Sequence, residues 1–387
     1  MGEAYIVGAV RSPIGKKNGK LSKTHPTDLL GSVVRGLLEK EDVDPLEVDQ
    51  VIGGCVTQCG EQGSNVTRNG WIAAGLPWDV AATSVDSQCG SSMQTLQFAA
   101  SSVRAGVYDL AIACGVEGMS RVPLGSNSVQ PGFAFSEAFL AACDGKLYTQ
   151  FMAAQQIAED YGFTREYMDS LALQSHQRAA RATEEGRFTR EVLPMKITLD
   201  DGTVEEMTVD ECIRPQTTME KLAALPAIQP ECPDMTAGNS SPISDGAAAL
   251  LVASEQACAR LGLKPRAVVR HMVVAATEPI VMLRGPVPVT YKFLKKTGMK
   301  LDDIDLFECN EAMGSIAPMW QKEFGVSWDV LNVNGSGISL GHPVGATGAR
   351  ILVTLLHELE RTGKRIGFQT MCEGGGMAHV TVIERLD

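Results

Sequence analysis

Apolar residues recur at helical spacing in two well-separated segments of the chain, and each segment follows a short strand-like run. In the first, AATSV (81–85) precedes a helical stretch that ends near Gly106. In the second, VLNVNGSG (330–337) precedes a helical stretch from about Gly345 to Glu360. The apolar positions that follow the 3.6-residue period are Met93, Leu96, Ala100 and Val103 in one stretch and Ile351, Leu352, Leu355 and Leu359 in the other. The pattern therefore predicts one amphipathic helix in each half of the chain.

The same order of elements occurs twice: strand, glycine-bearing turn, helix, strand and glycine-rich loop. The closing strands are DLAIACGVEGM (109–119) and RIGFQTMCEGGGMA (365–378), and Gly106 and Gly363 suit C-terminal caps of the two helices. Alternating strands and helices predict α/β layers with largely parallel strand pairing. We therefore expect a duplicated α/β fold.

Residues 119–245 interrupt this duplication. They hold many polar residues, several prolines and one long helical stretch, REYMDSLALQSHQRAARATEEGRF (165–188). We interpret this region as an insertion carried on the first half. The expected division is residues 1–118 plus 246–265 for the N-terminal half, 119–245 for the insertion and 266–387 for the C-terminal half.

Composition excludes several classes of protein. The 387 residues are 44% hydrophobic and 21% charged, with a net charge of −12, which argues against a nucleic-acid binder but leaves room for a local basic pocket. No apolar run approaches the roughly 18 residues that a membrane span requires. Ten scattered cysteines without a secretory signal favour reduced thiols in the cytoplasm. Cys55 and Cys59 form a CxxxC pair without a second pair, so we expect no metal site.

One cysteine occupies a special position. Cys89, in DSQCGSSM (86–93), lies on the predicted turn between a strand and a helix. The helix dipole and the free N–H groups at a helix N-terminus favour thiolate over thiol, and thiolate is the nucleophilic form. Gly90 lets a ligand or another chain approach closely. The alternative is a buried cysteine packed as a small apolar residue.

Three further motifs could carry chemistry. His342 opens the second helix and could act as a base near neutral pH, or could be a structural histidine. Asn310 follows an apolar strand and could reach a crevice at the sheet end, or could cap a turn. Cys372 ends a strand before three glycines, 374–376, whose backbone N–H groups could bind an oxyanion or could form a tight loop only. All of these residues fall on strand ends or helix starts at matching places in the two halves, so we expect them to share one crevice.

Four blocks of sequence, in this order, resemble the signatures of the thiolase family: QCGSS (88–92), NEAM (310–313), GHPVGATGAR (341–350) and CEGGG (372–376). RSPIGKKNG, EGMSRVP and TAGNSSPISDGAA extend the resemblance over essentially the whole chain. The resemblance implies a five-layered αβαβα fold, a CoA-binding loop domain inserted in the first half, and a homodimer or homotetramer.

The resemblance also implies a role for each residue of the site. Cys89 matches the nucleophile that takes up the acyl group as a thioester. Cys372 matches the acid/base that protonates the acetyl-CoA enolate and then deprotonates CoA. His342 matches the residue that polarises the thioester oxygen and helps to activate the nucleophile. Asn310 matches the residue that fixes a water in this first oxyanion hole, and the N–H groups of Cys89 and Gly374 match a second hole.

For the substrate, the resemblance implies CoA as a co-substrate and no permanently bound cofactor. Ser241 matches a serine that contacts the pantetheine arm, and Arg214 matches a basic residue near the adenine and phosphate end, although a solvated surface charge is the alternative. Phe151 stands before Met152, where acetoacetyl-specific members often have histidine. Met313 replaces a common phenylalanine. The charge of Glu373, beside Cys372, could raise the thiol pKa or could face solvent.

We therefore expect a degradative 3-ketoacyl-CoA thiolase of the kind used in fatty-acid β-oxidation. It would cleave 3-ketoacyl-CoA with CoA into acetyl-CoA and a shortened acyl-CoA, and bulky acyl chains such as steroid side chains are among the candidates. The alternatives are a biosynthetic acetoacetyl-CoA thiolase and a non-catalytic protein that binds CoA thioesters. We expect acyl-CoA and CoA as partners, and neither nucleic acid nor a membrane span.

Overall fold

In the computed structural model, which describes residues 2–129, 132–198 and 201–387, one ten-stranded sheet runs through the protein. The strand order is β10-β11-β12-β9-β1-β8-β5-β3-β4, and the short β2 pairs with β8. The strands are β1 (Tyr5–Arg11), β2 (Gly15–Lys16), β3 (Gln50–Gly54), β4 (Ala81–Val85), β5 (Leu110–Gly118), β8 (Ser244–Ala253), β9 (Ala267–Ala276), β10 (Leu306–Cys309), β11 (Ile366–Cys372) and β12 (Met377–Arg385).

The sheet repeats one arrangement on both sides of the β1–β9 contact. Strands β1, β8, β5 and β3 of the first half correspond in order and direction to β9, β12, β11 and β10 of the second. The predicted duplication is therefore confirmed. The prediction of largely parallel pairing is wrong, because only β3–β4, β3–β5 and β10–β11 are parallel among the described pairs. The loop of residues 373–376 between β11 and β12 is too short for a crossover, so these strands form an antiparallel hairpin.

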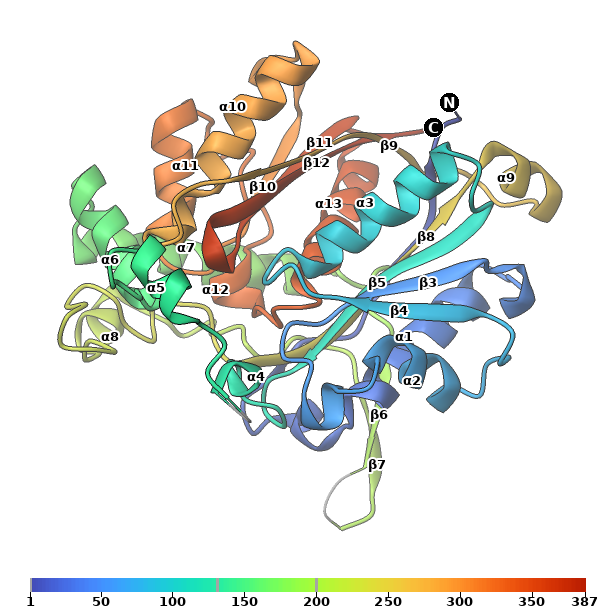
Figure 1. Cartoon of the computed structure of the whole chain (residues 1–387), viewed down its shortest axis with the longest axis horizontal. Helices are drawn as coiled ribbons and strands as arrows, with labels where there is room; N and C mark the ends of the chain where they lie inside the picture. Colours follow the sequence, from blue (N-terminus) through green and yellow to red (C-terminus); the bar gives the residue numbers. More distant parts are fainter. Residues whose placement is uncertain (1, 130–131, 199–200) are drawn as a thin grey trace.

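Helices separate and cover the two half-sheets in five layers (Figure 1). Helices α3 and α13 lie between the half-sheets, α1 and α2 cover the first half, and α10 and α11 cover the second. The helices outside the insertion are α1 (Pro26–Lys40), α2 (Val66–Ala73), α3 (Ser91–Arg104), α9 (Glu255–Leu261), α10 (Pro286–Thr297), α11 (Ile316–Phe324), α12 (Gly337–Leu340) and α13 (Thr347–Thr362). The αβαβα architecture is thus the one expected from the sequence.

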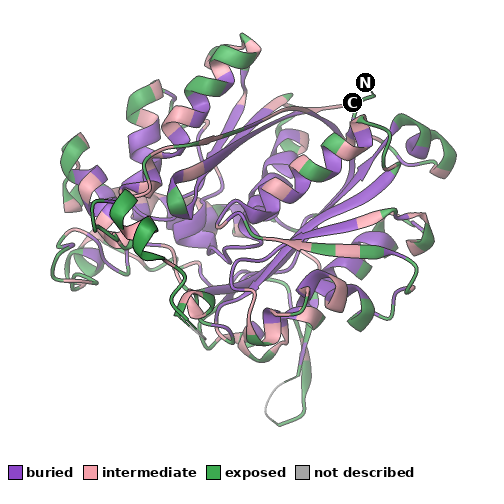
Figure 2. Ribbon diagram, in the orientation of Figure 1, coloured by how far each residue is buried: buried purple, intermediate pink, exposed green. Residues whose placement is uncertain are grey.

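Of the two central helices α13 is the more enclosed, whereas α3 keeps exposed and intermediate positions that give its ribbon mixed colours in Figure 2. Every residue of α13 from Thr347 to Leu359 is buried, because both half-sheets pack against this helix. The predicted glycine caps are confirmed, since Gly106 and Gly363 take left-handed φ angles of 72° and 68° after α3 and α13. The layers therefore fix the N-terminal ends of α3 and α13 near one another.

The segment between β5 and β8 forms a separate lobe around the long predicted helix. Its elements are α4 (Ser126–Val129), α5 (Glu137–Ala142), α6 (Gln150–Tyr161), α7 (Arg165–Glu184), β6 (Met195–Thr198), β7 (Val204–Met207) and α8 (Met219–Ala223). The β6–β7 hairpin projects from the body (Figure 1). The predicted helix of 165–188 is confirmed by α7.

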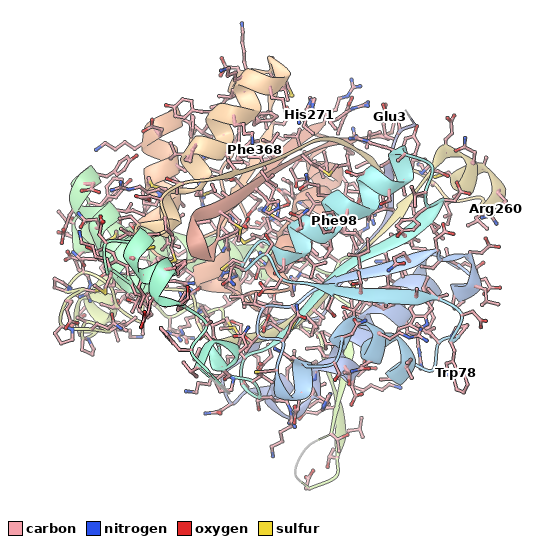
Figure 3. All side chains as sticks on the ribbon, in the orientation of Figure 1. Glu3, Trp78, Phe98, Arg260, His271 and Phe368 are labelled. Atoms are coloured by element: carbon pink, nitrogen blue, oxygen red, sulfur yellow. The ribbon has the colours of Figure 1, made fainter. Side chains whose placement is uncertain are left out.

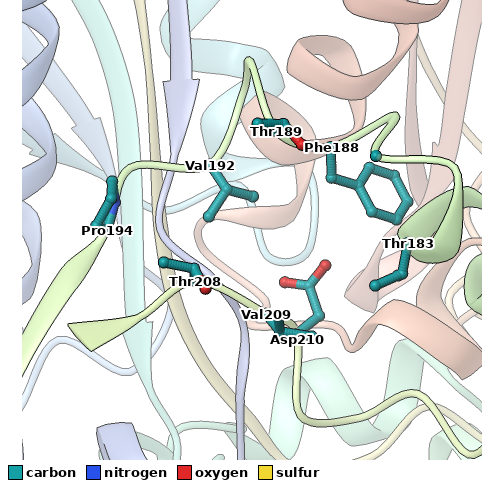
Figure 4. A pocket seen from close by; sticks show the side chains of 9 residues that line it. Thr183, Phe188, Thr189, Val192, Pro194, Thr208, Val209 and Asp210 are labelled. Atoms are coloured by element: carbon teal, nitrogen blue, oxygen red, sulfur yellow. The ribbon is translucent and has the colours of Figure 1, made fainter. Parts of the chain in front are cut away.

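A buried ionic cluster attaches this lobe to the central sheet. Arg11, on β1, donates to both carboxylate oxygens of Asp210 at 2.7 and 2.9 Å and to Glu191 at 2.7 Å. The guanidinium also lies 5.2 Å from the ring centre of Phe188. Asp210 and Phe188 line a cavity of about 380 Å³ on this side of the molecule (Figure 4). Since both oxygens of Asp210 are held by Arg11, this carboxylate serves to dock the lobe.

Candidate active site

The turn that carries Cys89 is held by hydrogen bonds on both sides. The strand AATSV is β4 and the following helix is α3, as predicted, and Gln88 takes a left-handed φ of 51° between them. Asp86 Oδ1 accepts from the Gln88 N–H at 2.7 Å, and Ser91 Oγ donates to the Gln88 carbonyl at 2.6 Å. A non-glycine residue in this region is uncommon, so the surrounding contacts fix the position of the cysteine.

The Cys89 sulfur lies among backbone N–H groups but remains a thiol. The side chain is 4% exposed, and the sulfur accepts from the N–H of Gly374 and from its own N–H. These donors lower the pKa of the thiol, but burial and then the Glu373 carboxylate outweigh them and raise it to about 12. The expectation that the helix N-terminus makes Cys89 a thiolate is therefore wrong, because burial raises the pKa of the thiol by more than the N–H donors lower it.

The second thiol is still more deeply enclosed. Cys372 is the last residue of β11 and has no exposed surface. Burial, followed by the charge of Cys89, raises the pKa of Cys372 well above its ordinary value. The Glu373 side chain is buried rather than solvated and raises the pKa of both thiols, so the alternative in which it faces solvent is wrong.

The glycine loop places one N–H group on Cys89. A β-carbon at Gly374 would lie 2.7 Å from Oε1 of Gln88, so a larger residue would have to displace the end of that side chain. Gly375 and Gly376 have φ angles of 72° and 83°, which non-glycine residues rarely adopt. The loop can therefore offer an N–H donor to an oxygen that develops charge beside Cys89.

His342 is held in one tautomer. Thr347 Oγ1 donates to the Pro343 carbonyl at 2.8 Å and lies 2.6 Å from Nδ1 of His342. The Thr347 hydroxyl donates its proton to the Pro343 carbonyl, so its oxygen acts as the acceptor for the Nδ1–H of His342. Nε2 of His342 therefore carries the free lone pair. Burial and then Arg350 lower the pKa of His342 to about 3. The resting imidazole is therefore neutral, with Nε2 free to accept a proton.

Asn310 contacts this lone pair and keeps one polar atom without a partner. Its Nδ2 lies 3.4 Å from Nε2 of His342, and its buried Oδ1 has no hydrogen-bond partner among the described residues. A β-carbon at Gly337 would lie 2.7 Å from that oxygen. The side chain is thus directed at His342 rather than at a backbone cap. An orphaned buried amide oxygen is typical of a position that binds water or substrate.

Contacts between the halves join these groups into one site. Val344, two residues after His342, and Met371, one residue before Cys372, pack with Cys89 in a single buried cluster. The carboxylate of Glu117, on β5, accepts from the N–H of Gly345 at 3.0 Å and so ties the His342 segment to the first half. The structure therefore brings Cys89 together with Cys372 and the 374–376 loop, and His342 together with Asn310, and the segment of residues 344–345 joins the two groups.

The residues expected to contact substrate belong to the lobe between β5 and β8. The N–H of Ser241 donates to the Ala312 carbonyl at 3.0 Å, which places Ser241 beside the Asn310 segment. Phe151 and Met152 are partly buried and pack against the core cluster that contains Met313. Arg214 is exposed and lies apart; it lines a separate cavity of about 370 Å³ together with Lys221.

Sequence reasoning missed three supporting side chains: Thr347, Glu117 and His379. Glu117 had a readable signal, because a carboxylate within the apolar run LAIACGVEG requires buried partners. Thr347 lies five residues after His342, so its contact depends on how the chain turns into α13. His379 lies on β12 and is brought to Glu373 by the hairpin of β11 and β12.

Two features are not found in the part of the chain that the structure describes. No group of three or more His, Cys, Asp or Glu side chains there is placed to hold a metal ion. No helix among the described residues is long and apolar enough to cross a membrane.

A five-layered α/β fold that encloses two thiols, a neutral imidazole and a backbone N–H donor defines a cysteine-dependent acyltransferase. Comparisons with known proteins support this class. The family models for the thiolase N-terminal and C-terminal domains match residues 4–256 and 263–385. The chain belongs to the thiolase family.

Several relatives match over the full length of the chain. The chain is 43% identical to the steroid 3-ketoacyl-CoA thiolase FadA6 of Mycobacterium tuberculosis, with 100% of this chain and 95% of the relative covered. It is also 43% identical to the 3-ketoacyl-CoA thiolase of Aliivibrio fischeri, with 100% of both chains covered. Among solved structures, the Bacillus anthracis acetyl-CoA acetyltransferase superposes with a TM-score of 0.92 at 36% identity, covering 100% of this chain and 99% of the other. Human mitochondrial 3-ketoacyl-CoA thiolase superposes with a TM-score of 0.91 at 31% identity and the same coverage.

Proposed function

We propose that this protein is a degradative 3-ketoacyl-CoA thiolase that cleaves 3-ketoacyl-CoA with CoA into acetyl-CoA and a shortened acyl-CoA. The observation that carries the proposal is the pair of buried thiols around one backbone donor: the Gly374 N–H donates to Cys89, and Cys372 lies in the field of the same sulfur. Full-length relatives named as 3-ketoacyl-CoA thiolases support it. Fatty-acid β-oxidation is the degradative role that this activity fits.

In the first half-reaction the Cys89 sulfur attacks the keto carbon, and its proton moves to Nε2 of His342. Since the pKa of the thiol is about 12 and that of the imidazole about 3, this transfer does not occur at rest and accompanies the attack. The N–H groups of Cys89 and Gly374 stabilise the oxygen of the tetrahedral intermediate. The C2–C3 bond then breaks, and the acyl group stays on Cys89 as a thioester.

The electrons of the broken bond form the enolate of acetyl-CoA, whose oxygen faces His342 and the water position at Asn310. Cys372 gives its proton to C2, and acetyl-CoA leaves. In the second half-reaction the Cys372 thiolate takes the proton of the incoming CoA thiol, and the CoA sulfur attacks the thioester. His342 returns its proton to Cys89, so the site ends as it began.

Two oxygens develop charge in this reaction, and the site offers two separate places for them. The enolate oxygen needs donors at His342 and Asn310, whereas the tetrahedral oxygen needs backbone N–H groups. The unpartnered Oδ1 of Asn310 is consistent with a water bound between substrate and amide.

CoA binding is assigned to the lobe formed by residues 119–245, which the domain division separates from the flanking halves 1–118 plus 246–265 and 266–387. Ser241, fixed to the Ala312 carbonyl, would contact the pantetheine arm, and Phe151 and Met152 would line the path to the thiols. Arg214 and Lys221 around a cavity of about 370 Å³ supply positive charge for the phosphates. Arg214→Ala should raise the KM for CoA several-fold and leave kcat nearly unchanged, whereas an unchanged KM would restore the reading of Arg214 as a surface charge.

We propose a homodimer rather than a homotetramer, and the open edge of the sheet supports this proposal. β4 is the free end of the sheet and has β3 as its one strand neighbour among the described residues, whereas residues 330–332 cover β10 at the opposite end. Trp78 and Phe98, labelled in Figure 3, lie before β4 and on the adjoining α3 and are 81% and 45% exposed. An open edge beside exposed aromatic residues suits pairing with a second copy.

The dimer can be tested by sedimentation. Wild-type protein should sediment at twice the 41.3 kDa chain mass, and Thr83→Lys on β4 should shift it toward monomer. Val204→Lys on the exposed β7 provides the matched control and should remain dimeric. A wild-type monomer would refute the assembly, and a fourfold mass would favour the tetramer.

Cytoplasmic localisation is proposed from the thiols. All ten cysteines lie in the described ranges and are free, which suits a reducing compartment.

The activity assay follows the absorbance of the 3-ketoacyl-CoA enolate after addition of CoA, with short, long and ring-bearing acyl chains. Turnover of several chain lengths supports the proposal, and turnover of ring-bearing chains extends it to bulky acyl groups. Activity confined to acetoacetyl-CoA would favour the biosynthetic acetoacetyl-CoA thiolase, an alternative that the acetyltransferase neighbour supports and Phe151 disfavours. No turnover of any chain would favour a non-catalytic binder of CoA thioesters.

A further inference from the structure

A buried carboxylate lies against both thiols, and the mechanism above gives it no task. Glu373 directly follows Cys372 and has no exposed surface. A β-carbon at Gly90 would lie 2.1 Å from its Oε1, so the carboxylate occupies the space where another residue would have a side chain. Because Gly90 directly follows Cys89, Glu373 lies between the two cysteine-bearing segments.

Glu373 is paired with a histidine that is equally enclosed. Nδ1 of His379, on β12, lies 2.5 Å from Oε1 of Glu373, and Nε2 lies 3.0 Å from Oε1 of Gln94 on α3. Ser87 Oγ donates to the second carboxylate oxygen at 3.3 Å. These contacts join four segments: the loop after Cys372, strand β12, helix α3 and the turn before α3.

The hydrogen bonds fix how many protons the pair holds. The amide oxygen of Gln94 can only accept, so Nε2 of His379 carries a proton. The contact of Nδ1 with Oε1 holds one further proton, whether it is nearer the nitrogen or the oxygen. The pair is therefore neutral overall, but its carboxylate end, not its imidazole end, acts on the two thiols.

Few other charges act on the two sulfurs. The titratable groups around them, apart from each other, are Glu373 from the glycine loop, His379 from β12 behind it, Glu117 from β5, Cys309 from β10 and the neutral imidazole of His342. Gln94 and Ser87, which complete the surroundings of Glu373, are uncharged. The Glu373 carboxylate is thus the charge that acts on both sulfurs.

We propose that Glu373 and His379 are positioning residues that set the proton affinity of the two thiols through the single proton they share. The carboxylate keeps Cys372 protonated until the enolate forms and makes the resulting thiolate a strong base toward CoA. His379 limits this effect by holding its N–H on the carboxylate. The pair transfers no proton to substrate; it acts only through its charge.

The proposal predicts opposite effects from removing each partner. Glu373→Gln removes the negative charge and should lower the pKa of both thiols, whereas His379→Asn leaves the carboxylate with the Ser87 hydroxyl but without the imidazole and should raise it. The readout is the rate of Cys89 alkylation by iodoacetamide at pH 8, followed by mass spectrometry without substrate. A shift of about one pH unit changes the thiolate fraction tenfold, and the accompanying change in nucleophilicity reduces the net effect to about threefold. Alkylation should therefore be about threefold faster in Glu373→Gln and about threefold slower in His379→Asn.

Glu278→Gln is the matched control, because Glu278 is an exposed residue whose backbone lies beside Gly376, at the other end of the same loop. It should leave the alkylation rate unchanged. In turnover, Glu373→Gln should lower kcat at constant KM for CoA, since a weaker Cys372 base slows the CoA step.

Unchanged alkylation in both variants, or a change of the same sign in both, would overturn the proposal, since a structural role alone gives no opposite shifts. If Glu373→Gln does not fold, His379→Asn decides by itself: slower alkylation supports the pair and an unchanged rate refutes it. The inference rests on the roles proposed for Cys89 and Cys372, but its readout needs no turnover. Failure of the proposed function would appear separately, as wild-type protein inactive on every acyl-CoA.

Discussion

The hydroxyl of Thr347 should control whether His342 can act as a base. Thr347→Val keeps the shape of the side chain and removes the oxygen that accepts from Nδ1 at 2.6 Å. The buried Nδ1–H would then lack a partner, which costs about 1–3 kcal/mol. The imidazole can avoid this cost by moving the proton to Nε2, the atom that must receive the Cys89 proton. The shifted tautomer has no lone pair on Nε2, and the unshifted one stabilises the imidazolium less, so either outcome weakens the base.

The expected loss follows from that range. Since about 1.4 kcal/mol corresponds to a factor of ten, kcat should fall roughly 5- to 150-fold in Thr347→Val. The KM for CoA should change little, because Thr347 is buried behind His342 and cannot reach a ligand in the lobe. Steady-state kinetics on a 3-ketoacyl-CoA measures both constants.

Thr347→Ser is the matched control, because it retains the hydroxyl and should keep nearly full activity. An unchanged kcat in the valine variant would refute the tautomer argument. A rise in KM with constant kcat would show that the threonine acts on binding instead.

Three further predictions concern the thiols, the junction of the halves and acid stability. Cys372→Ser should lower kcat by about 10²–10⁴-fold, the usual contribution of a general acid/base, while mass spectrometry still detects alkylation of Cys89; loss of that alkylation would mean that the substitution disturbs the nucleophile itself. Glu117→Gln should lower the free energy of unfolding in urea by about 2–4 kcal/mol, because the buried carboxylate accepts from Val56, Thr57, Gln62 and Gly345 and an amide leaves some of these donors unpaired; a stability loss below 1 kcal/mol would contradict it. Burial and then Arg214 lower the pKa of His176 from 6.5 to about 4. Between these two pH values the unfolded chain binds a proton at His176 and the folded chain does not. The free energy of unfolding therefore falls as the pH drops through this range. His176→Gln should flatten the decline of unfolding free energy between pH 6 and 5 by on the order of 1 kcal/mol per pH unit, and parallel curves for the two proteins would exclude this effect.

The elements beside the catalytic motifs were predictable because local patterns determine them. β4, the turn at Cys89 and α3 follow from a β-branched run, a polar turn and a 3.6-residue period, all within about two dozen residues of each other. The pairing directions of the strands were not predictable in the same way. The pairing directions depend on loop lengths and on the insertion. The insertion connects β5 to β8 and lets β8 pair antiparallel with β5.

The ionisation states of the site residues could not be predicted from the sequence either. A cysteine at a helix start suggests a thiolate, but enclosure between two half-sheets and the neighbouring Glu373 reverse the sign. Enclosure is a property of the packed layers and has no local signature. The same holds for Thr347, whose acceptor role depends on its hydroxyl being used on Pro343.

The junction of the two half-sheets has a consequence for synthesis of the protein. β1 pairs with β8 and with β9, so the first strand must wait until residues 244–276 have left the ribosome before its partners exist. Such long-range pairing slows folding and exposes unpaired strands in the meantime. Cys372 and the glycine loop arrive later still, among the last residues of the chain. A truncated chain therefore carries Cys89 but cannot form the enclosure around it, so the reactive centre arises only in the completed protein.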